Sequence, residues 1–562
     1  RTRGGTALNQ PSTPHPNFRP DIEGLRALAI LPILGFHLGI PGFAGGFVGV
    51  DVFFVISGFL LTGILLRDIA RPDYSLAEFY RRRVARILPA LLVMLVAVLA
   101  AGTWLLLPTE MTGLGRSAAA TAALGANLWF WSQVSYFAPL AESEPLLHAW
   151  SLGVEEQFYL IYPLLLIAAR RRPAVLLTLI LAGSFALACW WLAHDDPAAF
   201  YLLPARAWQF ALGGLAATGM VRIVGRRGLA AGFGLVLILA SAVFAGELRP
   251  LPMPAGTLAS IGAFLIVLAA PETPTGRLLS WRPLRVIGAR SYSLYLWHWP
   301  VVTFWRLGHG ATLGMGEVAG LLALTIVLAE LSYRFIERPA ISAGRRGAPG
   351  RVIVIGLGAA AAVAGIALAL PHWQRPLPPA VAKVANYASY DATPERRFQF
   401  RTGRCFLEGG GALAPECIAR DPRRPNWALI GDSHGAMLWR ALAERYPGVN
   451  LLQLTAPGCR PLPDAPAKLA CARARAAAWA DVAGDSRVGT VILAGRWQGS
   501  DLERLPRAIA RLRAAGKRVI VIGPVVEYDG GMPGLLARAM LAGEADRFDR
   551  FRLTDRAALD QR

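Results

Sequence analysis

The stretch DIEGLRALAILPILGFHLG, residues 21–39, is apolar over most of its length but carries Arg26 and His37. Eleven positions separate these residues, about three turns and about 16 Å of an α-helix, so both side chains lie near one face. Ionisable groups inside a membrane helix are costly and therefore mark candidate functional sites. A guanidinium near the cytoplasmic surface suits an anionic phosphate, and a buried imidazole suits proton abstraction. The alternative is an arginine that snorkels to the surface and a histidine bonded to a neighbouring helix.

Hydrophobic runs of this kind recur from Ile22 to Leu370 and stop after Pro371. Runs of about 16 to 22 residues are long enough to cross a hydrocarbon core of about 30 Å. The 562 residues are 54% apolar and 17% charged, with a mean hydropathy of +0.42, which excludes a single soluble domain and a largely disordered chain. Twelve candidate runs begin near residues 22, 46, 85, 117, 152, 173, 203, 228, 255, 290, 314 and 351.

Arginine-rich loops decide which of these runs are spans, because short loops rich in Lys and Arg stay in the cytoplasm. Such loops follow the second and the fifth run, so an even number of spans lies between them. The weak, Ala-rich run at 117–136 does not fit, and we predict that it is re-entrant or interfacial. The chain then has eleven spans, with its N-terminus in the cytoplasm and the part beyond Pro371 outside. The basic clusters are Arg81, Arg82, Arg83 and Arg86; Arg170, Arg171 and Arg172; Arg222, Arg226 and Arg227; Arg277, Arg282, Arg285 and Arg290; and Arg338, Arg345, Arg346 and Arg351.

The predicted topology explains the excess of positive charge. A net charge of +21 and a pI near 10.6 are often signs of nucleic-acid binding. Here many of the arginines cluster in loops predicted to be cytoplasmic, where they set topology and face an anionic partner. We therefore predict a lipid bilayer and no nucleic acid among the partners.

Beyond Pro371 the composition changes to that of a folded exported domain. Short β-branched runs end at Gly or Pro and alternate with helical patterns, which indicates a parallel, doubly wound α/β domain. The predicted strands lie in NWALIGDSH, VNLLQLTAPG, VGTVILAG and RVIVIGPV. The predicted organisation is a cytoplasmic tail at 1–20, a membrane domain at 21–340, a linking transmembrane helix at 351–371, a linker or ordered extension at 372–425 and the α/β domain at 426–562.

Four of the five cysteines lie in this exported part, where disulfides are permitted. Four cysteines allow three connectivities. Closeness in the sequence favours Cys405–Cys417 and Cys459–Cys471. The fifth, Cys189, lies in an apolar run, and we expect it to be buried.

Several motifs in the membrane part occur together. GVDVFFVISGF at 49–59 carries Asp51, and the basic loop FYRRRVARILP at 79–89 follows it. HAWSLGVEEQFY at 148–159 carries Glu155 and Glu156, and SYSLYLWHWP at 291–300 carries His298. With Arg26 and His37, this combination resembles the membrane acyltransferase family 3 over about residues 18–340.

The resemblance implies transfer of an acyl group, usually acetyl from acetyl-CoA, to a glycan hydroxyl on the far side of the membrane. Under it, His37 is the essential histidine with Arg26 as its partner. Arg81, Arg82 and Arg86 are candidate contacts of the CoA phosphates, although their loop also serves topology. Four further residues match motifs, with interhelical bonding as the alternative role for each: Asp51, Glu155, Glu156 and His298. No metal is implied.

The exported domain has its own candidate nucleophile. In NWALIGDSH a strand runs into Asp432 and Ser433 and then into a helical pattern, which exposes Ser433 at a turn beside a helix N-terminus. With the turn APGC at 456–459, this resembles the SGNH hydrolase superfamily in the form fused to such acyltransferases. By that resemblance Ser433 is the nucleophile and Gly458 an oxyanion-hole donor.

Two departures from the superfamily pattern matter. The third block normally supplies an Asn, but residues 493–497 read LAGRW. The last block normally places Asp and His three apart, but no His follows His434, and a serine without a base is a weak nucleophile. We expect the natural protein to continue and to supply this pair, since the α/β sheet looks C-terminally incomplete after an amphipathic helix at 544–562. The alternative is a degenerate domain that only binds glycans.

The predicted fold is therefore a polytopic all-α membrane domain of about ten spans plus one linking span, followed by an SGNH-type, flavodoxin-like α/β domain. Three functions compete: an acyltransferase, a transporter or flippase of glycan precursors, and a membrane-anchored esterase. An anchor needs one span, and a transporter needs neither a basic mouth nor a hydrolase-like domain. We favour acetyl transfer to a lipid-linked or membrane-associated glycan of the bacterial envelope, through His37 and then Ser433, with lipopolysaccharide O-antigen ranked first on the resemblance.

Overall fold

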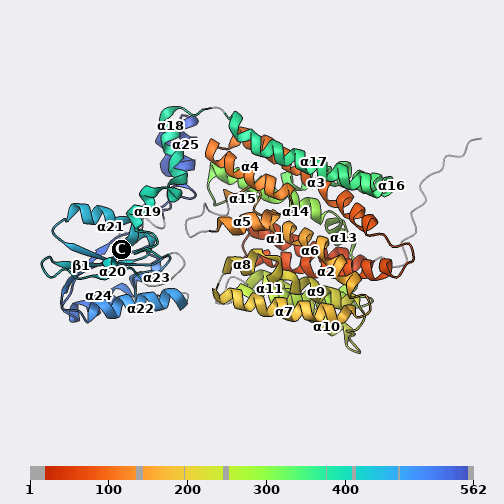
Figure 1. Cartoon of the computed structure of the whole chain (residues 1–562), viewed down its shortest axis with the longest axis horizontal. Helices are drawn as coiled ribbons and strands as arrows, with labels where there is room; N and C mark the ends of the chain where they lie inside the picture. The colour runs from red at the N-terminus through yellow and green to blue at the C-terminus, as the bar shows by residue number, and fades with distance from the viewer. Residues whose placement is uncertain are drawn as a thin grey trace, which may run out of the picture.

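The computed structural model describes residues 19–134, 143–194, 196–244, 252–374, 376–407, 413–465, 469–554 and 558. A large bundle of helices forms its N-terminal part, and a smaller lobe with a parallel sheet forms its C-terminal part (Figure 1). Each of the eleven runs predicted to span the membrane forms a helix. These helices are α1 (Pro20–His37), α2 (Gly49–Ile69), α3 (Leu76–Leu105), α6 (Ala149–Ala168), α7 (Pro173–His194), α9 (Leu203–Ala217), α10 (Arg227–Phe244), α11 (Pro252–Ala269), α14 (Ser291–His309), α15 (Met315–Ser332) and α17 (Pro349–Ala369).

By length and apolar composition alone, six helices of the described chain can cross a membrane. These lie in Gly46–Ile69, Leu76–Leu105, Pro173–Leu192, Arg227–Phe244, Met315–Arg346 and Pro349–Trp373. The other candidates are shorter or more polar: α9 has 15 residues, and α1 carries Asp21, Glu23 and Arg26. Eleven spans therefore stay a prediction.

The weak run at 117–136 does not form one straight helix. It is divided between α4 (Pro108–Ala122) and α5 (Ala126–Gln133), and Leu124 between them adopts a left-handed φ of 59°. Because 15 and 8 residues at about 1.5 Å each fall short of about 30 Å, neither helix crosses the bilayer by itself.

Close helix packing explains one of the motifs. A Cβ placed on Gly58 of α2 would lie 2.0 Å from the carbonyl oxygen of Phe210 on α9, and one on Gly213 would lie 1.9 Å from that of Val55. Small residues at such positions let two membrane helices approach closely. The glycine of the FFVISGF motif therefore brings α2 and α9 together beside the site described below.

Shorter elements complete the bundle. They are η1 (Gly46–Val48), α8 (Asp196–Tyr201), α12 (Pro274–Leu279), α13 (Arg282–Ala289), η3 (Tyr333–Glu337) and α16 (Arg338–Arg346). α16, with its arginines, precedes α17. The C-terminal lobe, which the sequence predicts to be exported and which is called the exported lobe below, follows α17, so the two lie at opposite ends of that helix (Figure 1).

The exported lobe contains the four predicted strands, β1 (Asn426–Gly431), β2 (Asn450–Thr455), β3 (Val488–Ala494) and β4 (Arg518–Ile522). All pair in parallel, in the order β2-β1-β3-β4. Strand residues alternate between two faces. Leu429 and Ile492 pack toward α21 (Ser433–Arg445). Ile430 and Leu493 pack on the other face, which is covered by α22 (Leu469–Ala483) and α24 (Leu505–Ala514). The doubly wound arrangement expected from the sequence is therefore present.

The segment before the sheet is ordered and partly helical. It contains η4 (Leu370–Trp373), α18 (Pro379–Asn386), η5 (Tyr387–Ala392), α19 (Pro394–Phe400) and α20 (Pro415–Ile418). The disulfides Cys405–Cys417 and Cys459–Cys471 are both present, in the pairing that closeness favoured. Cys189, which we expected to be buried, is exposed on α7 and in a bilayer would face lipid.

The short helix α23 (Gly499–Leu502) lies between β3 and α24, and after β4 the chain returns to the membrane domain. α25 (Met532–Leu541) lies beside α18, and an apolar cluster joins both to Leu107 (Figure 1). Arg538 forms an ion pair with Glu110, and the Asp529 carboxylate accepts a hydrogen bond of 3.0 Å from the backbone N–H of Thr312. The exported lobe is thus docked on the membrane domain.

The terminal segment differs from the amphipathic helix expected at 544–562. Residues Ala545–Phe551 form a 3-10 helix, η6, and the end of the range lies outside the described residues. The aromatic rings of Phe548 and Phe551 are buried against α25, which favours this tight turn over a continuous helix.

Candidate active site

His37 lies at the C-terminal end of α1 and is held by residues of α14. Its Nδ1 is 2.9 Å from Nε2 of His298, and the two imidazole rings are stacked with centroids 5.0 Å apart. The indole ring of Trp299 packs edge-on at 4.5 Å, and Arg306 donates a hydrogen bond of 2.9 Å to the carbonyl oxygen of His37. His298 is 2% exposed, whereas His37 is only half-buried. His298, expected only in a supporting role, is therefore in direct contact with the candidate catalytic histidine.

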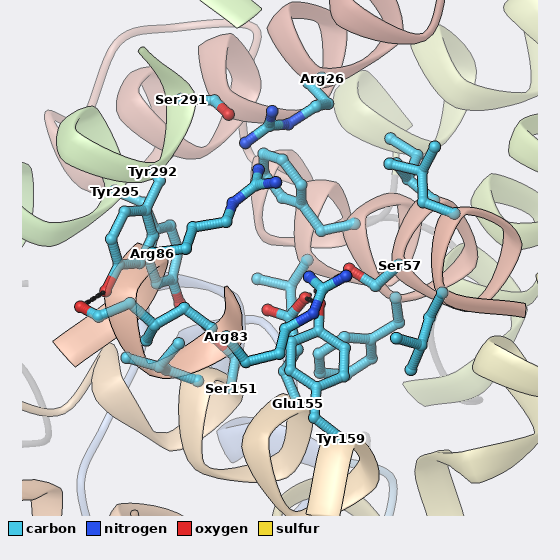
Figure 2. A pocket seen from close by; sticks show the side chains of 18 of the residues that line it. Arg26, Ser57, Arg83, Arg86, Ser151, Glu155, Tyr159, Ser291, Tyr292 and Tyr295 are labelled. Carbon is cyan, nitrogen blue, oxygen red and sulfur yellow. Dashed lines mark hydrogen bonds between the residues drawn. The ribbon is translucent and has the colours of Figure 1, made fainter. Parts of the chain in front are cut away.

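A cavity of about 280 Å³ lies further toward the other end of α1. Arg26 of α1 and Arg83 and Arg86 of α3 line it, and Figure 2 shows their guanidinium groups gathered inside it. Among the described residues, no hydrogen bond or ion pair to these three guanidinium groups is found. Arg83 is instead stacked over the ring of Tyr159 at 5.0 Å. Arg26 and His37 therefore lie on one helix but in different surroundings.

Glu155 of α6 is the acidic residue of the cavity lining. Its carboxylate accepts hydrogen bonds from the hydroxyls of Ser57 and Tyr159, all three near Arg83 in Figure 2. Three arginines thus surround one carboxylate, which leaves the cavity with an excess of positive charge. Glu156 is not part of the lining, and its Oε1 is buried without a hydrogen-bond partner in the described chain.

The structure separates the arginines of the basic loop. Arg81 forms an ion pair with Glu78, and Arg82 pairs with Asp68 at 2.6 Å and with Glu78 at 3.4 Å. Neither lines the cavity, whereas Arg83 and Arg86 of the same basic segment do. Arg81 is thus paired with a carboxylate one turn before it on α3, and Arg82 is paired with that carboxylate and with one on α2.

Asp51 has a structural environment. It forms an ion pair of 3.0 Å with Arg206 and accepts a hydrogen bond from Gln209, and both partners lie on α9. The guanidinium of Arg206 also lies over the rings of Trp150 and Phe200. Asp51 is 6% exposed and does not line the cavity, so the interhelical role weighed from the sequence describes it best.

Ser151 and Tyr295 connect the cavity with the histidines. Both line the cavity, and their hydroxyl oxygens are 2.6 Å apart. The Tyr295 hydroxyl donates to the carbonyl oxygen of His148 at 2.8 Å, and the Tyr295 carbonyl oxygen lies 2.8 Å from Nδ1 of His298. One residue of α14 therefore touches both the cavity and the His298 ring.

Sequence reasoning did not single out Ser57, Tyr159 and Tyr295 as site residues. Each lies inside a quoted motif, so the motifs themselves were the signal. Tyr159 follows Glu155 by four positions, and such a pair faces the same way on a helix. This spacing could have identified it.

In the exported lobe Ser433 is the first residue of α21 and directly follows β1 and Asp432. Asp432 is 2% exposed and caps the helix, because its carboxylate accepts a 2.8 Å hydrogen bond from the backbone N–H of His434. A second N–H, from Arg496, reaches it at 2.8 Å. Burial raises the pKa of Asp432, and these two bonds oppose the shift. Asp432 therefore ties the nucleophile turn to the end of β3.

Gly458 and Gly495 shape this turn. Gly458 has a φ of 65°, which a glycine adopts without strain, in the turn that follows β2. A Cβ on Gly495 would lie 2.7 Å from Pro461 and 3.3 Å from the Asp432 carboxylate. In the block after β3, where the sequence holds no Asn, Arg496 forms an ion pair with Glu527 at 2.6 Å. The turn of Gly458 therefore has the backbone geometry expected from the sequence, and an ion pair occupies the block after β3.

A metal site is not formed within the described ranges, where no three His, Cys, Asp or Glu side chains are grouped as ligands.

Two family models match the chain. The model described as "Acyltransferase domain" matches residues 19–334, and that described as "SGNH domain (fused to AT3 domains)" matches residues 399–562. No solved structure matches the chain.

Curated relatives share about a third of the aligned residues. The peptidoglycan O-acetyltransferase OatA of Listeria monocytogenes is 33% identical over 344 residues, 57% of this chain and 55% of the relative. The putative peptidoglycan O-acetyltransferase YrhL of Bacillus subtilis is 32% identical over 372 residues, which are 61% of this chain and 58% of the relative. The O-acetyltransferase OatA of Staphylococcus aureus is 33% identical over 358 residues, which are 58% of this chain and 57% of the relative. The chain thus spans little more than half the length of these relatives.

Proposed function

Because the chain belongs to the acyltransferase-3 family, whose domain covers residues 19–334, we propose that it is a membrane O-acetyltransferase. It transfers an acetyl group from cytoplasmic acetyl-CoA to a hydroxyl of a cell-envelope glycan on the other side of the membrane. The observation that carries this proposal is the cavity in which Arg26, Arg83 and Arg86 surround a single glutamate without ion-pair partners of their own in the described chain.

Acetyl-CoA fits this cavity by charge. Its phosphates are anionic, and guanidinium groups bind phosphate through charge-assisted hydrogen bonds. Like charges gathered away from bulk water repel, so an anion that enters between the three arginines is stabilised. The apolar residues of the lining, among them Phe53 and Leu60, suit the uncharged arm that carries the thioester.

His37 supplies the base for acyl transfer. Its imidazole takes the proton of the attacking hydroxyl, and the hydroxyl oxygen forms a bond to the thioester carbonyl carbon. The carbon–sulfur bond then breaks, and CoA leaves as a thiolate that takes up a proton. Ser151 and Tyr295, which connect the cavity with His298, place the histidines next to the donor's reactive end.

The exported lobe receives or orients the acceptor. Ser433 at the N-terminus of α21, beside the turn of Gly458, is placed to take the acetyl group before the glycan does. The contacts of Asp529 and Arg538 with the membrane domain keep this lobe at the side where the acetyl group emerges.

Two glycans are the leading acceptors. Two of the relatives are named as peptidoglycan O-acetyltransferases, one of them as a putative one, which favours peptidoglycan. Lipopolysaccharide O-antigen, ranked first from the sequence, rests on the family resemblance alone. The basic loops and the exported lobe support a bacterial inner-membrane location with the N-terminus inside.

The test is a transport-coupled acylation assay. We would reconstitute the protein in liposomes, supply radiolabelled acetyl-CoA on the side of the basic loops, and supply peptidoglycan fragments or O-antigen on the other side. We expect labelled ester on one of the two glycans and release of CoA. Labelling only when donor and acceptor share one side would refute transfer across the membrane, and no consumption of acetyl-CoA would refute the donor.

A further inference from the structure

We propose that His298 is a positioning residue that fixes the tautomer of His37, so that Nε2 of His37 is the unprotonated nitrogen available for the reaction. This inference rests on the proposed function, because it assigns the state in which His37 acts as the base.

The tautomer of His298 follows from its backbone contacts. Its Nδ1 lies 2.8 Å from the carbonyl oxygen of Tyr295 and 3.2 Å from that of Leu294. Carbonyl oxygens only accept hydrogen bonds, so Nδ1 of His298 carries the hydrogen. A neutral imidazole has one N–H, and Nε2 of His298 is therefore an acceptor.

The tautomer of His37 follows from that of His298. Since Nε2 of His298 accepts, the nitrogen 2.9 Å away, Nδ1 of His37, has to donate. The lone pair of neutral His37 then lies on Nε2. Within the described chain the structure records no hydrogen bond to this Nε2, and the His37 side chain is half-buried rather than sealed.

Other residues hold the same ring in place. Trp299 packs edge-on against His37, and its indole N–H is anchored by a hydrogen bond of 2.7 Å to the carbonyl oxygen of Glu144. The carbonyl oxygen of His37 is bound by Arg306. Rotation of the imidazole would break the bond to His298 and its stacking, so orientation and tautomer are fixed together.

The same contact serves the protonated state. When Nε2 of His37 takes a proton from the attacking hydroxyl, Nδ1 becomes a donor on a cation, and its hydrogen bond to His298 becomes stronger. His298 keeps its own proton, because its Nδ1 stays bonded to backbone carbonyls. In a catalytic triad a carboxylate orients the histidine and fixes its tautomer. His298 fills this orienting role here as a neutral side chain.

A pair of substitutions separates this role from simple packing. His298→Leu removes the group that accepts the hydrogen bond from Nδ1 of His37. His298→Gln keeps an acceptor there, because its amide oxygen lies near the position of Nε2. Loss of the residue that fixes a catalytic tautomer lowers kcat by up to about 10⁴-fold in serine proteases. For His298→Leu we expect kcat to fall about 100-fold or more with KM for acetyl-CoA nearly unchanged, and for His298→Gln we expect most of this loss to be restored.

The matched control is His309→Gln, because His309 is exposed in the last turn of the same helix. It should leave kcat unchanged. Full activity of His298→Leu, or equal loss in the Leu and Gln variants, would overturn the positioning role. No consumption of acetyl-CoA by the unmodified protein would instead refute the proposed function, so the two failures are distinguishable.

A measurement on the unmodified protein does not depend on how the variants fold. In ¹⁵N NMR of the histidine-labelled protein in lipid nanodiscs, with the His37 signals assigned by their absence in His37→Ala, we expect a protonated Nδ1 and an unprotonated Nε2. A protonated Nε2 in the neutral ring would overturn the inference.

Discussion

The two candidate reaction centres of the chain differ in how completely their side chains are supported. In the membrane domain His37 has a stacked and hydrogen-bonded partner in His298, and a basic cavity lies alongside. In the exported lobe Ser433 has the strand-to-helix turn, the Asp432 cap and the Gly458 turn, but the printed sequence holds no histidine after the adjacent His434. Because His37 and the basic cavity are the proposed base and donor site, we expect the membrane domain to control the rate of the first transfer.

The strongest test of this comparison is His37→Ala. We expect acetylation to fall about 10³-fold, because a positioned general base contributes about 10² to 10⁴ in rate. The measurement is release of CoA from acetyl-CoA in liposomes, with membrane insertion verified by protein blot. The control is His309→Ala on the surface of α14, which should be fully active. Normal CoA release by His37→Ala would move the chemistry away from the membrane domain.

The donor site can be sharpened by comparing arginines of one loop. We expect Arg83→Ala or Arg86→Ala to raise KM for acetyl-CoA about 10-fold to 100-fold, because a hydrogen bond to a charged group is worth about 1.5 to 3 kcal/mol. Arg82→Ala is the matched control. Its guanidinium is paired with Asp68 outside the cavity, so KM should stay nearly constant. An effect of Arg82→Ala equal to that of Arg83→Ala would contradict the assignment of the cavity.

The exported centre should show a smaller effect. For Ser433→Ala we expect glycan acetylation to fall about 10-fold and release of CoA to fall less, because in the proposed function His37 of the membrane domain is the base of the first transfer. Mass spectrometry of the glycan and the CoA assay are measured in parallel. Unchanged glycan acetylation would mean that the membrane domain acylates the glycan directly.

The smallest effect concerns stability of the exported lobe. Arg487 and Arg420 hold the pKa of Asp485 well below its ordinary range. Stability from this carboxylate is therefore present above the usual Asp pKa of about 4 and is lost as pH falls toward the lowered value. At pH 7 we expect Asp485→Asn to cost about 1 kcal/mol. This corresponds to a Tm lower by about 2 to 4 °C.

The control for this change is Asp464→Asn, an exposed site in the same lobe. Calorimetry at pH 7 and below pH 4 checks both variants. A Tm difference between Asp485→Asn and the unmodified protein that persists undiminished in acid would show that the ion pairs are not its cause.

Much of the architecture could be predicted from local patterns. The pattern of apolar residues located all eleven long runs and the four strands. Burial of one or both faces of a helix or strand makes apolar residues recur in the sequence with a period that can be counted. The break of the weak run at Leu124 agrees with its polar composition. The prediction of an amphipathic helix in the terminal segment was wrong over Ala545–Phe551. Burial of Phe548 and Phe551 against α25 favours a 3-10 helix there over the helix that the sequence pattern indicated.

The candidate site was predicted as a set of motifs but not as a geometry. Arg82 and Arg83 are adjacent on α3, in the basic segment that we expected to be a loop, and Arg86 follows about one turn later. No local rule separates them, and only the position of Asp68 on α2 takes Arg82 out of the cavity. The same limit applies to Asp51, whose partners Arg206 and Gln209 lie about 155 residues away.

The sequence by itself predicted a helical membrane domain, a basic segment suited to an anionic partner, and a doubly wound C-terminal lobe with Ser433 at a helix start. The period of apolar residues, the charge of loops and the residues of turns are local properties of the sequence. They can be recognised without knowing which distant segments pack together. The tertiary structure alone decided which arginines face the cavity and that His37 and His298, 261 residues apart, share a hydrogen bond. A hydrogen bond depends on distance and direction between atoms on separate helices, and only their packing sets these.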